Sequence, residues 1–184
     1  MGATGESVKR LTDFGYHPAW SPDGKEILCS TDFINVYYTR ETIPSEVWSV
    51  NVDTGEKRLV TKGDAVQPQW SPHGLRIAYW GYKDDKRYIW TMPANGGEPV
   101  VVTNCEGDWH PIWSPDGGYL YFVSDRSGSM NLWRAPIEEA SGKVLGPPEP
   151  VTTPSTYSMH PSFSRDGRRL AYVDETRRFN LQKI

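Results

Sequence analysis

The chain has 184 residues and a formal net charge of −3, from 20 basic and 23 acidic side chains. This balance, without a clustered basic face, excludes a partner held mainly by phosphate neutralisation, so no nucleic acid is expected. No apolar run is long enough for a membrane-crossing helix, and no membrane contact is expected. Residues 1–7 lack a secretory signal pattern, which leaves the compartment undetermined.

One eight-residue pattern occurs four times along the chain. Its serines, Ser21, Ser71, Ser114 and Ser164, are separated by 50, 43 and 50 residues. Self-similarity at this period indicates repeated blades or solenoid units. The copies are His17-Pro-Ala-Trp-Ser-Pro-Asp-Gly24, Gln67-Pro-Gln-Trp-Ser-Pro-His-Gly74, His110-Pro-Ile-Trp-Ser-Pro-Asp-Gly117 and His160-Pro-Ser-Phe-Ser-Arg-Asp-Gly167.

Each copy predicts a hairpin turn between two strands. Proline presets φ at the second turn position, aspartate suits the third, and glycine takes the positive φ that closes the turn. We expect the motif serine to bond backbone within its own hairpin. The strands predicted after the turns are 26–30, 76–80, 119–123 and 169–173; third strands are predicted at 46–50, 88–92, 131–135 and 180–184, and fourth strands at 57–61 and 99–103.

The two ends of the chain complement each other in this pattern. Thr4-Gly-Glu6 repeats Thr54-Gly-Glu56, so Val8–Thr12 is predicted to be a lone fourth strand. The last unit, in contrast, stops in its third strand at Ile184. A strand from the N-terminus that completes the last blade would remove an exposed sheet edge.

Four short antiparallel strands per unit, with bulky aromatics in the first and third, describe a blade of a β-propeller. The repeat resembles the TolB-type, WD-like β-propeller family, whose blades begin with Pro-x-Trp-Ser-Pro-Asp-Gly. That resemblance implies an all-β fold but not one function, because similar propellers accompany receptor kinases, prolyl-oligopeptidase-type peptidases and oligogalacturonate lyases. Departures from the motif are His73 for aspartate, and Phe163 and Arg165 for tryptophan and proline.

The predicted organisation is a single propeller domain over residues 1–184, made of four four-stranded blades. The blade repeats are expected at about 13–61, 62–103, 104–153, and 154–184 with 4–12. Bulky spacers such as Trp20 resemble those of larger rings. The sequence therefore favours a homodimer that forms one eight-bladed ring over a closed four-bladed monomer, with the N-terminal strand completing the last blade of the partner or of its own chain.

The function favoured by the residues is a non-enzymatic scaffold that recognises a protein, a peptide or a saccharide. Exposed aromatics on one face of a rigid propeller mark a binding surface. The alternative for the insertion at 31–45 is that its apolar residues simply pack over the blade edge. The aromatics assigned to this face are Phe33, Tyr37, Tyr38, Trp109 and Tyr157.

A second hypothesis concerns the residue before each motif proline: His17, Gln67, His110 and His160. First strands of a propeller line its central channel, so these side chains are expected to converge and to surround a metal, an anion or another small ligand. The resemblance to oligogalacturonate lyases, which hold a metal at channel histidines, implies a lyase-like relative as the alternative function. The simpler interpretation is that His-Pro begins a strand and its ring bonds to a neighbouring blade.

No catalytic residue, cofactor or metal ligand is assigned from the sequence. There is no Gly-x-Ser-x-Gly elbow, no phosphate-binding glycine loop before a helix, and no cysteine or histidine pair at zinc-finger spacing. The pairs Asp84-Asp85 and Glu138-Glu139 are interpreted as solvated turn charges, and residues 138–150 as a stiff, proline-containing spacer.

Overall fold

The computed structural model describes residues 8–32, 44–61, 63–84, 86–105, 107–152, 158–164 and 166–174, and the regular structure in these ranges is β-strand. The prediction of an all-β fold is confirmed. In the same ranges, no helix is long and apolar enough to cross a membrane.

The strands form four antiparallel sheets, which we call blades 1 to 4 in chain order. Blade 1 contains β1 (Tyr16–Trp20), β2 (Glu26–Ser30), β3 (Val47–Asn51) and β4 (Lys57–Leu59). Blade 2 contains β5 (Val66–Trp70), β6 (Arg76–Lys83), β7 (Lys86–Pro93) and β8 (Val100–Val101). Blade 3 contains β9 (Trp109–Trp113), β10 (Tyr119–Ser124), β11 (Asn131–Glu138), β12 (Lys143–Val144) and β13 (Glu149–Pro150); blade 4 is described by β14 (Ser158–Phe163) and β15 (Leu170–Asp174).

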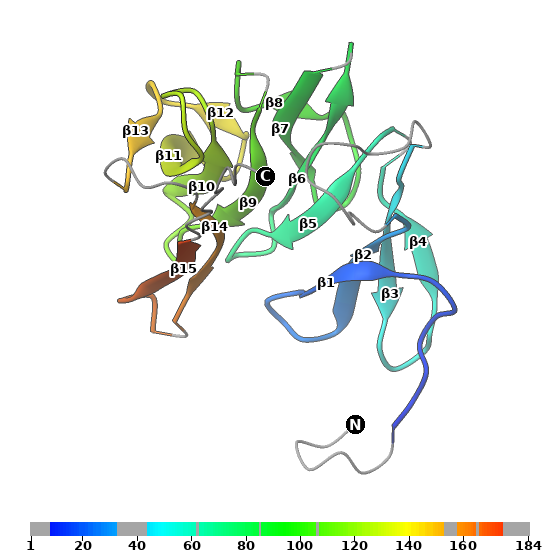
Figure 1. The fold of residues 1–184 in the computed structure, drawn as a ribbon. Coiled ribbons are helices and arrows are strands. Elements are labelled where there is room, and N and C mark those ends of the chain that lie inside the picture. The colour runs from blue at the N-terminus through cyan, green and yellow to red at the C-terminus, as the bar shows by residue number, and fades with distance from the viewer. Residues whose placement is uncertain are drawn as a thin grey trace, which may run out of the picture.

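The blades follow one another along an arc, with the first strands β1, β5, β9 and β14 on its inner side (Figure 1). No described strand of blade 1 pairs with a described strand of blade 4, so the sheets are not closed into a ring. The expected third strand of blade 4, 180–184, lies outside the described residues. A four-stranded last blade, and the ring size, therefore stay predictions.

The N-terminal segment lies on blade 1 and forms no strand at residues 8–12. Lys9 donates from Nζ to the backbone oxygens of Val52, at 3.2 Å, and Asp53, at 2.9 Å. Phe14 packs edge-on against Trp48 with ring centroids 5.8 Å apart. The predicted strand over Val8–Thr12 is thus wrong: these residues pair with no described strand, and Lys9 instead caps carbonyls of blade 1. Completion of the last blade by the N-terminus, in one chain or in a dimer, stays a prediction.

Residues 138–150 are not a plain spacer. The third strand of blade 3 continues to Glu138, and a turn returns the chain to pair with it as β12 and then β13. Gly142 makes this turn possible with a φ of +73°, and its N–H donates to the Glu138 carbonyl at 2.8 Å. Pro150 is tolerated because it lies in the edge strand β13.

The motif turns are closed by their serines, as expected. In blade 3, Ser114 donates from Oγ to Asp116 Oδ1 at 2.6 Å and accepts from the backbone N–H of Tyr119 at 2.8 Å. Ser21 and Ser164 make the equivalent pairs of bonds in blades 1 and 4. In blades 1, 3 and 4 the hairpin is therefore tied by a serine hydroxyl that links its aspartate to the start of the second strand.

We expect Ser114→Ala to lower the free energy of unfolding by about 1 kcal/mol, because it removes both bonds of a largely buried hydroxyl. Urea denaturation measures the change. Ser127→Ala is the matched control, since its hydroxyl makes only a 3.4 Å contact with Asn131 and should change stability by less than about 0.5 kcal/mol. Equal effects of the two substitutions would contradict this role of Ser114.

Two hydrophobic clusters join neighbouring blades. One contains Leu28 and Val47 of blade 1 with Ile77 of blade 2, and the other joins blades 2, 3 and 4 around Trp80 and Phe122. The motif tryptophans show where such packing stops: Trp113 is 6% exposed between blades, whereas Trp20, on the open flank of blade 1, is 61% exposed. The inner ends of the first strands are thereby held in fixed relative positions.

Candidate functional site

Each first strand is interrupted at the residue before the motif proline. The pairing register shifts between Tyr16 and Ala19 in blade 1, and at the equivalent place in the other three blades. Proline has no N–H to give to the ladder, so a bulge is the conformation in which a strand accommodates it. Bulges of this kind re-aim side chains, and here they do so at the same point of every blade.

The four residues at these bulges have left-handed backbone. Their φ angles are +55° at His17 and +51° at each of Gln67, His110 and His160. For residues with a Cβ this region costs about 1 kcal/mol each, and such strain tends to cluster at binding and switch sites. The structure therefore repeats one costly conformation four times, at the residues that the sequence singled out.

The four side chains line one open cavity of about 210 Å³, which we call the ring cavity. The prediction that these positions converge is confirmed. The His110 and His160 rings lie closest, with centroids 4.5 Å apart and planes tilted by 53°. Gln67 is oriented by Trp80, whose Nε1 donates to Gln67 Oε1 at 2.6 Å. The other lining residues are Pro18, Gln69, Pro111, Ile112 and Pro161.

The imidazoles of His17 and His110 are neutral at physiological pH. Burial, aided by the nearby His160 and His17, lowers the pKa of His110 to about 3. Burial is also the main cause that lowers the pKa of His17, with His160 acting in the same direction and Asp32 opposing them. A neutral imidazole offers one hydrogen-bond donor and one acceptor. His17 and His110 thus present uncharged polar groups to the cavity, and not the positive charge that would attract an anion.

Asp108 holds the strand that carries His110. Arg126 donates from Nη2 to both carboxylate oxygens of Asp108, at 3.2 and 3.0 Å, and Asp108 is fully buried. Burial raises the pKa of Asp108, and bonds from Ser124 and Arg126 oppose that shift. The pair anchors the start of β9 two residues before His110. Sequence reasoning did not find this pair, since its partners are 18 positions apart and belong to no motif.

A second cavity of about 250 Å³, the turn cavity, adjoins the first. Gln69, Ile112 and Pro161 line both, and the turn cavity continues between the aromatic rings of Trp70, Trp113 and Phe163. The bulky motif aromatics were predicted to be spacers between blades, and Gln69 and Ile112 were not predicted to line a site. The alternation of side chains along a strand could have identified Gln69 and Ile112, because they follow Gln67 and His110 by two positions and so lie on the same face.

Of the aromatics assigned to an exposed binding face, the structure contradicts Trp109. It is 1% exposed, because Met130 packs against it and the Arg87 guanidinium lies 4.9 Å from its ring centroid. It stacks on His110 with centroids 5.8 Å apart, so it supports the ring cavity from behind. Phe33, Tyr37, Tyr38 and Tyr157 lie outside the described residues.

The described residues contain no group of three or more histidine, cysteine, aspartate or glutamate side chains arranged to hold a metal ion. His110 and His160 meet closely, but the third imidazole, His17, does not complete a coordination geometry with them. Among the described residues, the lining of the ring cavity offers hydrogen bonds through its imidazoles and the Gln67 amide, and apolar contact through its prolines.

Repeated antiparallel sheets whose first strands line one cavity define the chain as a β-propeller protein. It belongs to the TolB β-propeller domain family, whose sequence model matches residues 2–183. The structure of TolB from Acinetobacter baumannii is similar, with a TM-score of 0.75 and 24% identity, and the match covers 94% of this chain and 41% of that protein.

Two further similar proteins are an uncharacterized bacterial protein and a lyase. "Uncharacterized protein Atu1656" from Agrobacterium fabrum is 26% identical over 193 residues, which cover 81% of this chain and 62% of the relative. An oligogalacturonate lyase in complex with manganese is similar with a TM-score of 0.59 and 17% identity, covering 83% of this chain and 45% of the lyase. This chain therefore spans less than two thirds of each relative's length.

Proposed function

We propose that the chain is a non-enzymatic recognition module that binds a segment of a protein or peptide in the ring cavity and the adjoining turn cavity. The observation that carries this proposal is the convergence of four left-handed bulge residues on one cavity. Uncharged donors and acceptors suit the backbone of an extended chain, and the prolines and aromatics of the turn cavity suit its apolar side chains.

The proposed binding site lies at the centre of the arc, and not on the aromatic face that was predicted from the sequence. Trp109, the one described member of that face, is buried and supports His110 instead. The match to the TolB β-propeller domain family is compatible with a recognition role.

The second candidate is a small-ligand or metal site at the same imidazoles, in a lyase-like relative. The close approach of His110 and His160 favours it, since neutral imidazole is a common metal ligand. Elemental analysis of the purified protein separates the candidates. A stoichiometric metal that is lost in His110→Asn, His160→Asn would support the second candidate and count against the first.

We expect peptides selected from a displayed random library to lose roughly tenfold or more in affinity for Gln67→Asn and His160→Asn variants, because each change removes or displaces a polar partner in the cavity. Asparagine is chosen because it tolerates left-handed backbone, so the bulge is retained. Leu145→Ala, at a residue 61% exposed and remote from the cavity, is the control. Peptides whose affinity falls equally for all three variants, or for none, would count against the ring cavity as the binding site.

A further inference from the structure

The motif turn of blade 2 lacks its own carboxylate. His73 stands where blades 1, 3 and 4 have Asp23, Asp116 and Asp166. In those three blades the aspartate accepts from the motif serine at 2.6 to 2.7 Å. Ser71 of blade 2 still accepts from the backbone N–H of Arg76 at 2.8 Å, but its turn supplies no acceptor for the hydroxyl proton.

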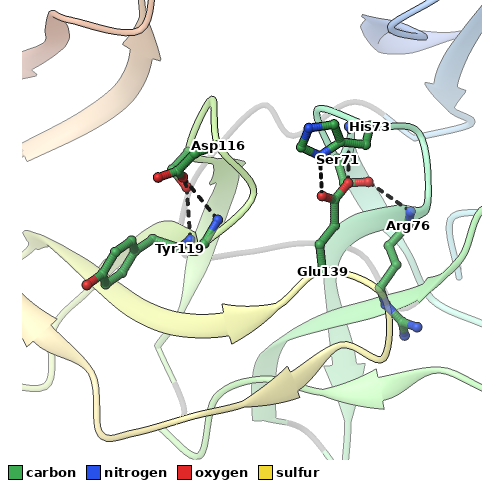
Figure 2. Close-up of polar contacts among 8 residues, drawn as sticks. Ser71, His73, Arg76, Asp116, Tyr119 and Glu139 are labelled. Atoms are coloured by element: carbon green, nitrogen blue, oxygen red, sulfur yellow. Dashed lines mark hydrogen bonds and ion pairs between the residues drawn. The ribbon is translucent and has the colours of Figure 1, made fainter.

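Glu139 of blade 3 occupies the missing position. It accepts from the backbone N–H of His73 through Oε1 at 3.1 Å, and its Oε2 lies 2.6 Å from His73 Nδ1. The Ser71 side chain also lies near the Glu139 carboxylate and helps to lower its pKa. Figure 2 shows Glu139 reaching to Ser71 and His73, beside the intact turn of blade 3 with Asp116 and Tyr119.

The surroundings of Glu139 fit this placement. Its side chain is only 9% exposed, which corrects the interpretation of Glu138-Glu139 as solvated turn charges. Burial alone would raise the pKa of Glu139, but hydrogen bonds from Ser71 and His73 outweigh it and hold the pKa below its ordinary value. The carboxylate lies against Gly117 of blade 3, where a Cβ would collide with it. Glycine at 117 thus serves the turn, through its φ of +74°, and leaves room for the glutamate.

We infer that Glu139 replaces the missing turn aspartate of blade 2 from the neighbouring blade, and thereby locks blades 2 and 3 together. In the other motif turns the aspartate carboxylate accepts a hydrogen bond from the serine of its own hairpin. Here the same bonds cross a blade boundary, between residues 66 positions apart. The locked turns contribute Pro72, Ser114 and Pro115 to the turn cavity, so Glu139 acts as a positioning residue for that cavity.

The residue of blade 2 that corresponds to Glu139 supports this inference. Residue 96 of blade 2 is the counterpart of Glu139 when Trp90 is matched with Trp133, and it is a glycine. Blade 2 therefore extends no carboxylate toward the turn of blade 1, and that turn has its own aspartate, Asp23. Between blades 2 and 3, where the turn of blade 2 lacks a carboxylate, blade 3 supplies Glu139. Between blades 1 and 2, where the turn of blade 1 has its own aspartate, the corresponding residue of blade 2 is a glycine.

The test is a cycle of substitutions at 73 and 139 followed by thermal unfolding. Glu139→Ala should lower the Tm by roughly 5 °C, because it leaves a buried serine and a backbone N–H without a charged acceptor. Glu138→Ala, which removes the same charge from the adjacent residue and only an exposed bond to Ser141, should change the Tm by about 1 °C or less.

The sign of the His73→Asp effect is the decisive readout. In the Glu139→Ala background, His73→Asp should restore most of the lost Tm, since the new aspartate can accept from Ser71 within its own turn. In the wild-type background it should lower the Tm, because two carboxylates then compete for one site. Equal effects of His73→Asp in both backgrounds would overturn the inference, as would equal Tm values for Glu138→Ala and Glu139→Ala. If Glu139→Ala does not fold, a folded double variant supports the inference and an unfolded one overturns it.

Discussion

Replacing Trp109 with alanine is expected to lower the free energy of unfolding by about 3–5 kcal/mol, the range for removing a large buried aromatic. Trp109 is 1% exposed in the cluster that joins blades 2, 3 and 4, and it contacts Met130, Arg87 and the His110 ring. Surrounding strands are held by their own ladders, so the space cannot collapse fully. Urea denaturation monitored by fluorescence measures the loss.

Trp20→Ala is the matched control for this prediction. It removes the same side chain from the other end of a first strand, where Trp20 is the last residue of β1 and is 61% exposed. At a protein concentration at which light scattering gives the mass of the monomer, Trp20→Ala should change the free energy of unfolding by less than about 0.5 kcal/mol. A stable Trp109→Ala protein that had lost only ligand binding would contradict the buried role of Trp109 and restore it to a binding face.

The difference between Trp20 and Trp109 also shows what the sequence could predict. The hairpins around Ser21, Ser114 and Ser164 depend on contacts within a few residues, so turn chemistry and strand alternation located them closely. Convergence of His17, Gln67, His110 and His160 was predictable because equivalent positions of a repeat occupy equivalent places around an axis. Burial of Trp109 was not, since it depends on Arg87 and Met130 from other strands.

Glu139 is the clearest example of a feature that the pattern could not locate. Its partners, Ser71 and His73, are near neighbours only after blades 2 and 3 have packed. The sequence does show that the turn of blade 2 lacks its acceptor, because His73 departs from the motif. It does not show which residue of the next blade reaches that turn. Similarly, the left-handed φ angles at the residues before the motif prolines emerged only from the structure.

The ring cavity makes stability depend on pH through His110. Its folded-state pKa is about 3, against 6.5 for an exposed histidine, because burial and the neighbouring imidazoles disfavour the charged form. Between these two values the unfolded chain binds one more proton than the folded protein. Stability is therefore complete above pH 6.5 and falls as the pH is lowered, by about 1.4 kcal/mol for each unit well below 6.5.

From pH 7 to 4.5 this linkage is expected to remove about 2–3 kcal/mol of stability from the protein. The direction of the pKa shift at His17, also downward, adds to the loss. The motif aspartates Asp23, Asp116 and Asp166 do not obscure it, since their pKa values are lowered from 3.8 and their contribution is lost only below that range. Urea midpoints measured at half-unit steps of pH give the curve.

The variant that isolates the effect is His110→Asn, which keeps a residue that tolerates left-handed backbone and removes the titrating ring. Its stability should fall less steeply than that of the wild type between pH 6.5 and 4.5, so that the two curves converge in acid. Leu145→Ala serves as the control, because Leu145 is 61% exposed, lies outside the cavity and leaves the His110 ring in place. Parallel curves for wild type and His110→Asn would show that the His110 ring can be protonated in the folded protein, and that the ring cavity accepts charge. In that case an anion, not an uncharged segment of a polypeptide, would be the ligand that its chemistry suits.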